Sequence, residues 1–114
     1  MITATAFVVA AAAGALARTE AGRRWNRHDG FPLGTLLVNL SGSFLLGLLA
    51  EATSPMATVM GAGALGAYTT FSSFARDTVA LAENGKFSAA AVYVAVSCAG
   101  GGLAAAAGVG IANL

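Results

Sequence analysis

The segment Thr69–Phe74, Thr-Thr-Phe-Ser-Ser-Phe, places four hydroxyl side chains and two phenylalanines in six consecutive positions. It lies at the end of an uncharged stretch, residues 52–75, that is long and apolar enough to span a bilayer. Consecutive Thr and Ser hydroxyls compete with the helical backbone for hydrogen bonds, and Gly66 lowers helix preference further. The sequence therefore predicts a helix break near Gly66–Thr70, which would free carbonyls for protein groups, water or a bound cation.

The two phenylalanines of this segment allow two interpretations. Phe71 and Phe74 are three residues apart and therefore share a helix face. They could simply fill packing or lipid-facing space. Alternatively, their ring edges, which carry positive quadrupole potential, could accept a small dehydrated anion.

Other polar side chains recur at helical spacing within apolar segments. Thr35, Asn39 and Ser43 are each four residues apart and lie along one helix face. Tyr93 and Ser97 have the same spacing nearer the C-terminus. Such residues either form hydrogen bonds between helices or line a polar track across the membrane.

The elements that must position these residues are four uncharged segments, 1–17, 31–50, 52–75 and 87–114. The chain has 114 residues, of which 57% are hydrophobic and 10% charged, and its mean hydropathy is +0.75. A soluble domain would have about 25% charged residues. We expect an all-α membrane protein with four transmembrane helices in a single domain over residues 1–114. The first helix would continue past Arg18, and a basic connection would follow over Thr19–Pro32.

The remaining residues argue against enzyme chemistry. Cys98 is the only cysteine, which excludes an intrachain disulfide and a multi-cysteine metal site. His28 is the only histidine and is interpreted as solvated, and the five acidic residues fall near predicted helix ends. We therefore expect neither an enzyme nor a nucleic-acid-binding protein.

Three motifs cover most of the chain: GALAR at 14–18, FPLGTLLVNLSGSFLLGLL at 31–49 and GALGAYTTFSSFARD at 63–77. In these motifs the chain resembles the Fluc (CrcB) family of fluoride channels. The resemblance implies a fluoride-selective channel that passively exports fluoride across the cell membrane (plasma or inner membrane), as a multi-pass protein, and confers fluoride resistance. It further implies an antiparallel, dual-topology dimer with two pores.

The resemblance also implies roles for individual residues. The implied fluoride pore comprises Phe71, Phe74, Asn39, Ser43, Thr35, Tyr93 and Ser97. Backbone carbonyls of Gly66 and Thr69 would hold a structural sodium ion at the centre of the dimer interface. Arg18 and Asp77 would have structural or vestibular roles, and Asp77 stands where the family often has glutamate.

The charge distribution leaves the identity of the partner open. The connections after the first and third spans share one side and carry Arg23, Arg24, Arg27 and Lys86, whereas the other side has no Lys or Arg. The positive-inside rule then favours a single orientation. The chain either forms a homodimer despite this bias or pairs with an oppositely oriented paralogue.

Two further alternatives are membrane proteins that are not fluoride channels. A non-conducting membrane assembly protein would explain the abundant glycines but not Asn39 together with the Thr69–Phe74 cluster. A small multidrug exporter would need an acidic residue in the first span, and residues 1–17 contain none.

Overall fold

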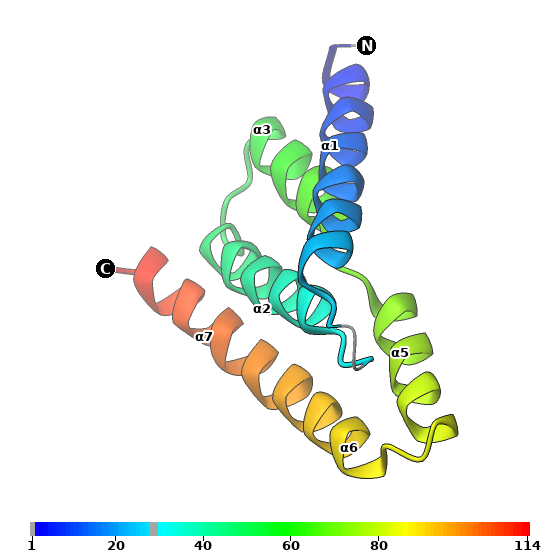
Figure 1. Ribbon diagram of the computed structural model, residues 1–114. Helices are drawn as coiled ribbons and strands as arrows, with labels where there is room; N and C mark the ends of the chain where they lie inside the picture. Colours follow the sequence, from blue (N-terminus) through cyan, green and yellow to red (C-terminus); the bar gives the residue numbers. More distant parts are fainter. Residues whose placement is uncertain (1, 28–29) are drawn as a thin grey trace.

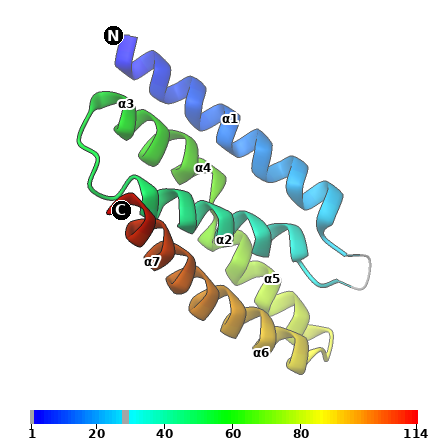
Figure 2. The same cartoon turned by 90° about the vertical axis from the view of Figure 1, so that its left-hand side faces the viewer.

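The computed structural model describes residues 2–27 and 30–114, and this part of the chain is all-helical (Figure 1). Its four helical arms are α1 (Ile2–Trp25), α2 (Leu33–Leu48), α3 (Pro55–Thr58) through α5 (Phe71–Glu83), and α6 (Phe87–Ala95) through α7 (Gly101–Ala112). Figure 2 shows both termini and the α2–α3 connection at one end of the molecule, and the other two connections at the opposite end. His28 lies outside the described residues.

The first arm is longer than the sequence predicts. The expected connection begins at Thr19, but α1 remains helical to Trp25. Glu20 accepts hydrogen bonds from Arg23 and Arg24, three and four residues later, and such pairs support helical geometry. The chain then turns back at Gly30, whose φ of 94° is readily adopted only by glycine.

The third arm contains the predicted discontinuity. Ser54 Oγ accepts a hydrogen bond from the Ala57 N–H and caps α3. A π-helical segment, η1 (Val59–Leu65), and one short turn, α4 (Gly66–Tyr68), follow. Thr69 and Thr70 then adopt extended backbone conformations before α5 begins. The discontinuity lies inside the predicted range but is confined to its end, since Gly66 itself is helical.

The fourth arm is continuous from Phe87 to Ala112, with a π-helical segment, η2 (Val96–Gly100), between α6 and α7. By length and composition, this arm and α1 are each able to cross a membrane, whereas Leu33–Leu48 is a shorter apolar helix. Large apolar side chains such as Val8, Leu16 and Leu103 are mostly exposed on these arms. Such a surface fits contact with lipid rather than water.

Glycines allow the closest helix contacts. α2 packs most extensively against α7, and α1 packs against η1 and α4. A methyl group added at Gly47 would overlap the Ala105 carbonyl, and one at Gly108 would overlap the Phe44 carbonyl. Backbones approach this closely in membrane bundles only where side chains are small.

The buried core is small and lies near the end opposite the termini. It consists of Leu36, Leu81, Ala90 and Tyr93, with Phe31 and Phe74 among the rings packed against it. Because α2, α5 and α6 all contribute to this core, it holds the segment after the break against α2 and α6.

Candidate functional site

Asn39 on α2 anchors the break in the third arm. Its Nδ2 donates to the Thr70 carbonyl at 3.0 Å, and the Thr70 N–H donates to its Oδ1 at 2.8 Å. The side-chain amide thus pairs with both backbone polar groups of one residue and replaces the bonds that a helix would have supplied. Since an amide NH₂ group has two hydrogens, one N–H of Asn39 remains for another acceptor.

The break deprives four carbonyls, those of residues 66–69, of their usual helical donors. In a continuous helix, the N–H of Thr70 would donate to Gly66 and the N–H of Ser73 would donate to Thr69. Here the Thr70 N–H donates to Asn39, and the Ser73 N–H donates to Thr70 Oγ1 at 3.0 Å. The family resemblance implied that the carbonyls of Gly66 and Thr69 bind sodium.

A cavity of about 320 Å³ opens beside the break, between α2, α5 and η2. It is lined by Asn39, Ser43, Leu46, Thr69, Thr70, Phe71, Phe74, Ser97 and Cys98. Five of the seven residues expected in the pore therefore gather around one space. Amide and hydroxyl groups contribute the polar lining, and no lysine or arginine is among the lining residues.

The two phenylalanines occupy different environments in this cavity. Their ring centroids are 5.9 Å apart at an interplanar angle of 47°. Phe74 packs against the core and lies 5.2 Å from the Tyr93 ring. Phe71, by contrast, is 80% exposed. The cavity is therefore open on the side of Phe71.

The remaining two expected pore residues lie in a second polar cluster. Tyr93 is fully buried, Thr35 is 7% exposed, and both lie near Asp77 on α5. The Tyr93 hydroxyl and Asp77 Oδ2 are buried without a hydrogen-bond partner. The ring contact between Phe74 and Tyr93 connects this cluster to the cavity. Asp77 was expected in a structural or vestibular role, and the structure places it beside two expected pore residues.

Other residues were missed or are placed elsewhere. Thr70, Leu46 and Cys98 also line the cavity. Ser41 and Tyr68 share a hydrogen bond of 3.0 Å between α2 and the end of α4. The role of Thr70 as an N-cap could have been recognised from the Thr70–Ser73 spacing. Arg18 is partly buried on α1 and is not among the cavity-lining residues.

The described residues contain no group of three or more His, Cys, Asp or Glu side chains able to hold a metal ion. The carbonyls of Gly66 and Thr69 provide the oxygen ligand type that a hard cation prefers.

Comparison with known proteins identifies a family and several relatives. Residues 5–109 match the family model described as CrcB-like protein, Camphor Resistance (CrcB). A fluoride-specific ion channel FluC 2 of Haloarcula marismortui is 53% identical over 68 residues, which cover 58% of this chain and 57% of that protein. A fluoride-specific ion channel FluC of Bordetella petrii is 42% identical over 102 residues, which cover 83% of this chain and 79% of that protein.

The alignment with the Haloarcula protein spans less than two thirds of that protein's length, whereas the alignment with the Bordetella protein spans more than two thirds of its length. The family model covers nearly the entire chain, including α2, the break and η2. The chain therefore belongs to the CrcB family and is a membrane protein.

Proposed function

We propose that this chain is the subunit of a fluoride-selective channel that passively exports fluoride and confers fluoride resistance. The observation that carries the proposal is the cavity in which Asn39, Ser43 and Ser97 meet Phe71 and Phe74. The names of relatives with 42% and 53% identity, which are fluoride-specific ion channels, support the choice of ion. No catalytic step is part of this function.

The lining offers what a dehydrated fluoride ion needs. The second N–H of Asn39 and the hydroxyls of Ser43 and Ser97 are donors, and Ser97 Oγ is buried without a partner. Ring edges of Phe71 and Phe74 add positive potential without a full charge. Because no lysine or arginine lines the cavity, the ion is not held by a fixed cation and can leave, as conduction requires.

Tyr93, Thr35 and Asp77 extend the polar route beyond the cavity. Phe74 lies between the cavity and the Tyr93 ring, at 5.2 Å from it. Hydroxyls of Tyr93 and Thr35 would receive fluoride from the cavity as water returns to the ion. Asp77 lies near both hydroxyls, and its Oδ2 has no hydrogen-bond partner among the described residues.

We propose that the working unit is an antiparallel homodimer in the plasma or inner membrane, with residues 1–114 as a single multi-pass domain. The exposed ring of Phe71 supports this assembly, since a second subunit would cover it and complete the site. A structural sodium ion at the centre of the interface would bind the carbonyls of Gly66 and Thr69. The N–H groups that would donate to these carbonyls in a continuous helix donate instead to the side chains of Asn39 and Thr70.

A heterodimer is the second candidate assembly, and a specific observation favours it. Every Lys and Arg lies in segments 18–27 and 76–86, and none lies in the α2–α3 connection or near the termini. Such asymmetry favours insertion in one orientation. The partner would then be an oppositely oriented paralogue. A non-conducting membrane assembly protein is the third alternative, which the flux assay below addresses.

Fluoride efflux from liposomes tests the channel function. The purified chain is reconstituted with internal fluoride, and efflux is followed with a fluoride electrode, with chloride as the competing anion. We expect rapid fluoride efflux and little chloride efflux. Phe71→Ile should abolish the efflux, whereas Phe87→Ile should not, because Phe87 is similarly exposed but does not line the cavity.

The outcomes separate the alternatives. Equal fluoride efflux from the wild type and Phe71→Ile would show that the cavity beside Phe71 is not part of the fluoride pore. If the well-folded single chain is silent but conducts with a co-expressed oppositely oriented paralogue, the homodimer is wrong and the heterodimer is supported. Replacing sodium by a bulky organic cation should lower the efflux and the melting temperature of the dimer if sodium is structural.

A further inference from the structure

A second cavity, of about 360 Å³, lies at the end of the molecule opposite the termini. It is lined by Arg27, Phe31, Leu81, Lys86 and Ala89 and shares no residue with the cavity around Phe71. Its residues come from the α1–α2 connection, α5, the α5–α6 turn and α6. The proposed conduction mechanism uses none of them.

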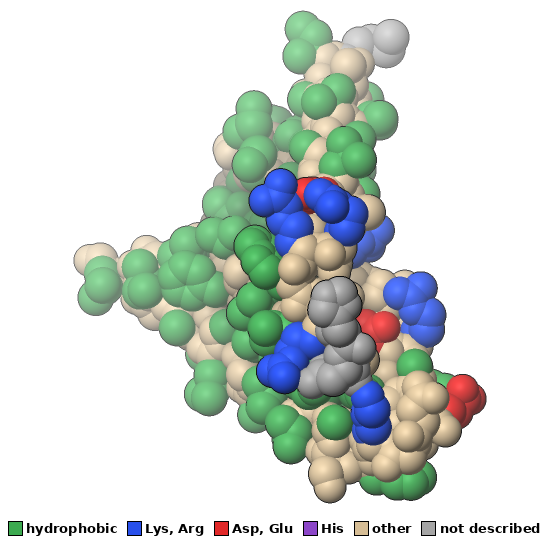
Figure 3. Space-filling view, in the orientation of Figure 1, with side chains coloured by type: hydrophobic (Ala, Val, Ile, Leu, Met, Phe, Trp, Pro, Cys, Tyr) green, Lys and Arg blue, Asp and Glu red, His purple; other side chains and the backbone are tan. Residues whose placement is uncertain are grey.

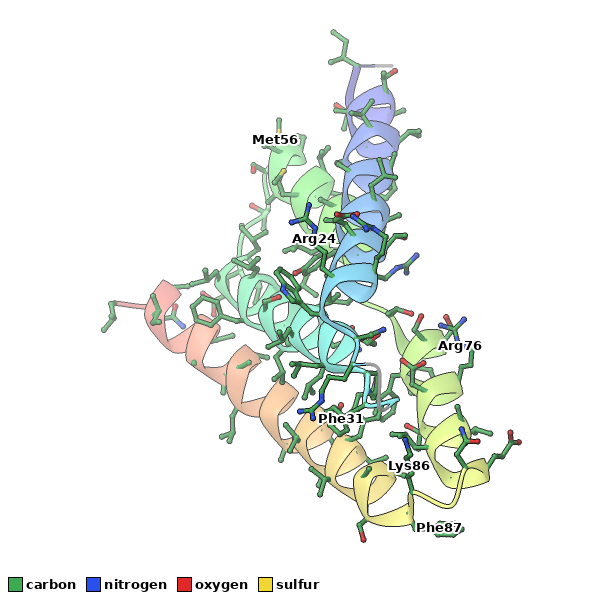
Figure 4. All side chains as sticks on the ribbon, in the orientation of Figure 1. Arg24, Phe31, Met56, Arg76, Lys86 and Phe87 are labelled. Carbon is green, nitrogen blue, oxygen red and sulfur yellow. The ribbon has the colours of Figure 1, made fainter. Side chains whose placement is uncertain are left out.

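The two cations of this cavity come from different interhelical connections that the fold brings together. The N–H of Arg27 donates to the Phe31 carbonyl at 2.9 Å, so these two residues of the first connection lie next to each other. Lys86 Nζ lies next to Gly30 of the same connection, at 3.3 Å from the position that a Cβ atom would occupy on that glycine. Figure 4 shows Phe31 and Lys86 together beside the start of α6, with Arg24 further along α1.

Both cations also have interaction partners within the chain. An arginine side chain has five N–H donors and a lysine side chain has three. Each side chain therefore has several donors with which it could also bind a phosphate group.

The walls of this cavity are hydrocarbon. Leu81 is 2% exposed, and Phe31 and Ala89 pack against the same buried core. A small, strongly hydrated anion would gain nothing from such walls. A ligand with a phosphate next to an acyl chain would satisfy both the cations and the apolar surface.

The cavity also lies where lipid headgroups are expected. Trp25 at the end of α1 and Phe87 at the start of α6 are 52% and 69% exposed, and exposed aromatic rings at helix ends are typical of the membrane interface. Lys and Arg side chains are spread over the middle of one face, from the lower half of α1 downward, and the far ends of the arms show none (Figure 3).

We propose that the cavity lined by Arg27, Phe31, Leu81, Lys86 and Ala89 binds an anionic phospholipid. Arg27 and Lys86 bind its phosphate, and the first carbons of its acyl chains lie against Phe31, Leu81 and Ala89. Basic pockets between transmembrane helices are a known way of binding such headgroups. The bound lipid would hold the α1–α2 connection against the α5–α6 turn.

Native mass spectrometry of the intact protein from detergent micelles tests this proposal, with phosphatidylglycerol and phosphatidylcholine of identical acyl chains as competing probes. We expect retention of phosphatidylglycerol over phosphatidylcholine. Arg27→Gln with Lys86→Gln should weaken phosphatidylglycerol binding by about twenty-fivefold, since each basic side chain at a lipid surface contributes about fivefold. The matched control is Arg23→Gln with Arg24→Gln, which removes the same charge from an exposed part of α1.

A second variant, Ala89→Trp, fills the cavity while both cations remain. It should also reduce phosphatidylglycerol binding, and circular dichroism and gel filtration confirm that each variant is folded. Equal losses in the cavity and control pairs would overturn the proposal, because binding would then reflect overall charge. Binding of glycerol phosphate as strongly as of the intact lipid would overturn it too, since the apolar walls would then contribute nothing.

Discussion

α2 contacts two of its neighbours in opposite ways. Against α7, Gly47 and Gly108 let the backbones meet so closely that no side chain fits between them. Against the break between α4 and α5, Asn39 extends a polar side chain to the backbone of Thr70. The first contact excludes all other groups, whereas the second borders a cavity.

This difference distinguishes a contact that only joins two helices from a contact that leaves room for a ligand. The glycine contact leaves no volume for a ligand, so its role is to hold two helices together. The asparagine contact replaces helical hydrogen bonds, exposes carbonyls and leaves one N–H for another acceptor. The following predictions test this contrast, from the largest expected effect to the smallest.

Gly108→Leu should have the largest effect on stability. Its side chain would overlap the Phe44 carbonyl and the neighbouring backbone of α2, and backbone atoms cannot move aside easily. We expect a loss of about 3 kcal/mol or more, at the upper end of overpacking costs, and a low yield of monodisperse protein. Thermal unfolding in detergent measures the loss.

The control for this prediction is Gly110→Leu. No atom lies within 4 Å of a Cβ built at Gly110, so this variant should unfold at the wild-type temperature. If both variants are equally destabilised, the cost comes from losing glycine itself and not from the α2–α7 contact.

Asn39→Ala should be the next most disruptive change. It leaves the N–H and the carbonyl of Thr70, a residue only 6% exposed, without partners. Each unsatisfied buried group costs about 1–3 kcal/mol, and fluoride efflux should be lost as well. Asn39→Asp retains the acceptor for the Thr70 N–H and should be less destabilising than Asn39→Ala. Equal melting temperatures for the two variants would contradict this account of the break.

Thr70→Val tests the start of α5 alone. It removes the hydroxyl that accepts from the Ser73 N–H at 3.0 Å but retains the shape of the side chain. Loss of an N-cap costs about 1 kcal/mol. Thr70→Ser should restore the stability, as measured by thermal unfolding. A Val variant as stable as the wild type would show that the cap is dispensable.

Tyr93→Phe should have the smallest effect on stability. The hydroxyl has no hydrogen-bond partner, and the ring contacts with Phe31 at 5.8 Å and Phe74 at 5.2 Å are retained. We therefore expect an unchanged melting temperature but a several-fold slower fluoride efflux, because a donor on the polar route is lost. Unchanged efflux would place Tyr93 outside the route.

Much of this arrangement could be predicted from local sequence. The hydroxyls after Gly66 indicated a break, and the structure has one at Thr69 and Thr70. The spacing of Asn39 and Ser43 placed them on one face, and both line the cavity. The end of α1 was predicted too early, because Thr19 and the following charged residues suggested a loop. The helix instead continues there, and Glu20 pairs with arginines three and four residues later.

Other features depended on contacts between distant residues. Nothing in the sequence near Asn39 indicates that its amide pairs with Thr70, 31 residues away. The division of the expected pore residues between the cavity and the Asp77 cluster likewise depends on how α5 and α6 pack. Arg27 and Lys86 seemed only to mark one side of the membrane, until the fold placed them at one cavity.

The sequence by itself determined that the chain has four apolar arms, that the third arm breaks near residue 70, and which polar side chains lie within the apolar segments. These properties follow from local composition and spacing, because hydropathy and backbone preferences act over a few residues. Only the tertiary structure decided which carbonyls lose their donors, which rings share a cavity and which cations meet. Those outcomes depend on the packing of helices far apart in the sequence, where glycine contacts and a single amide set the distances between backbones.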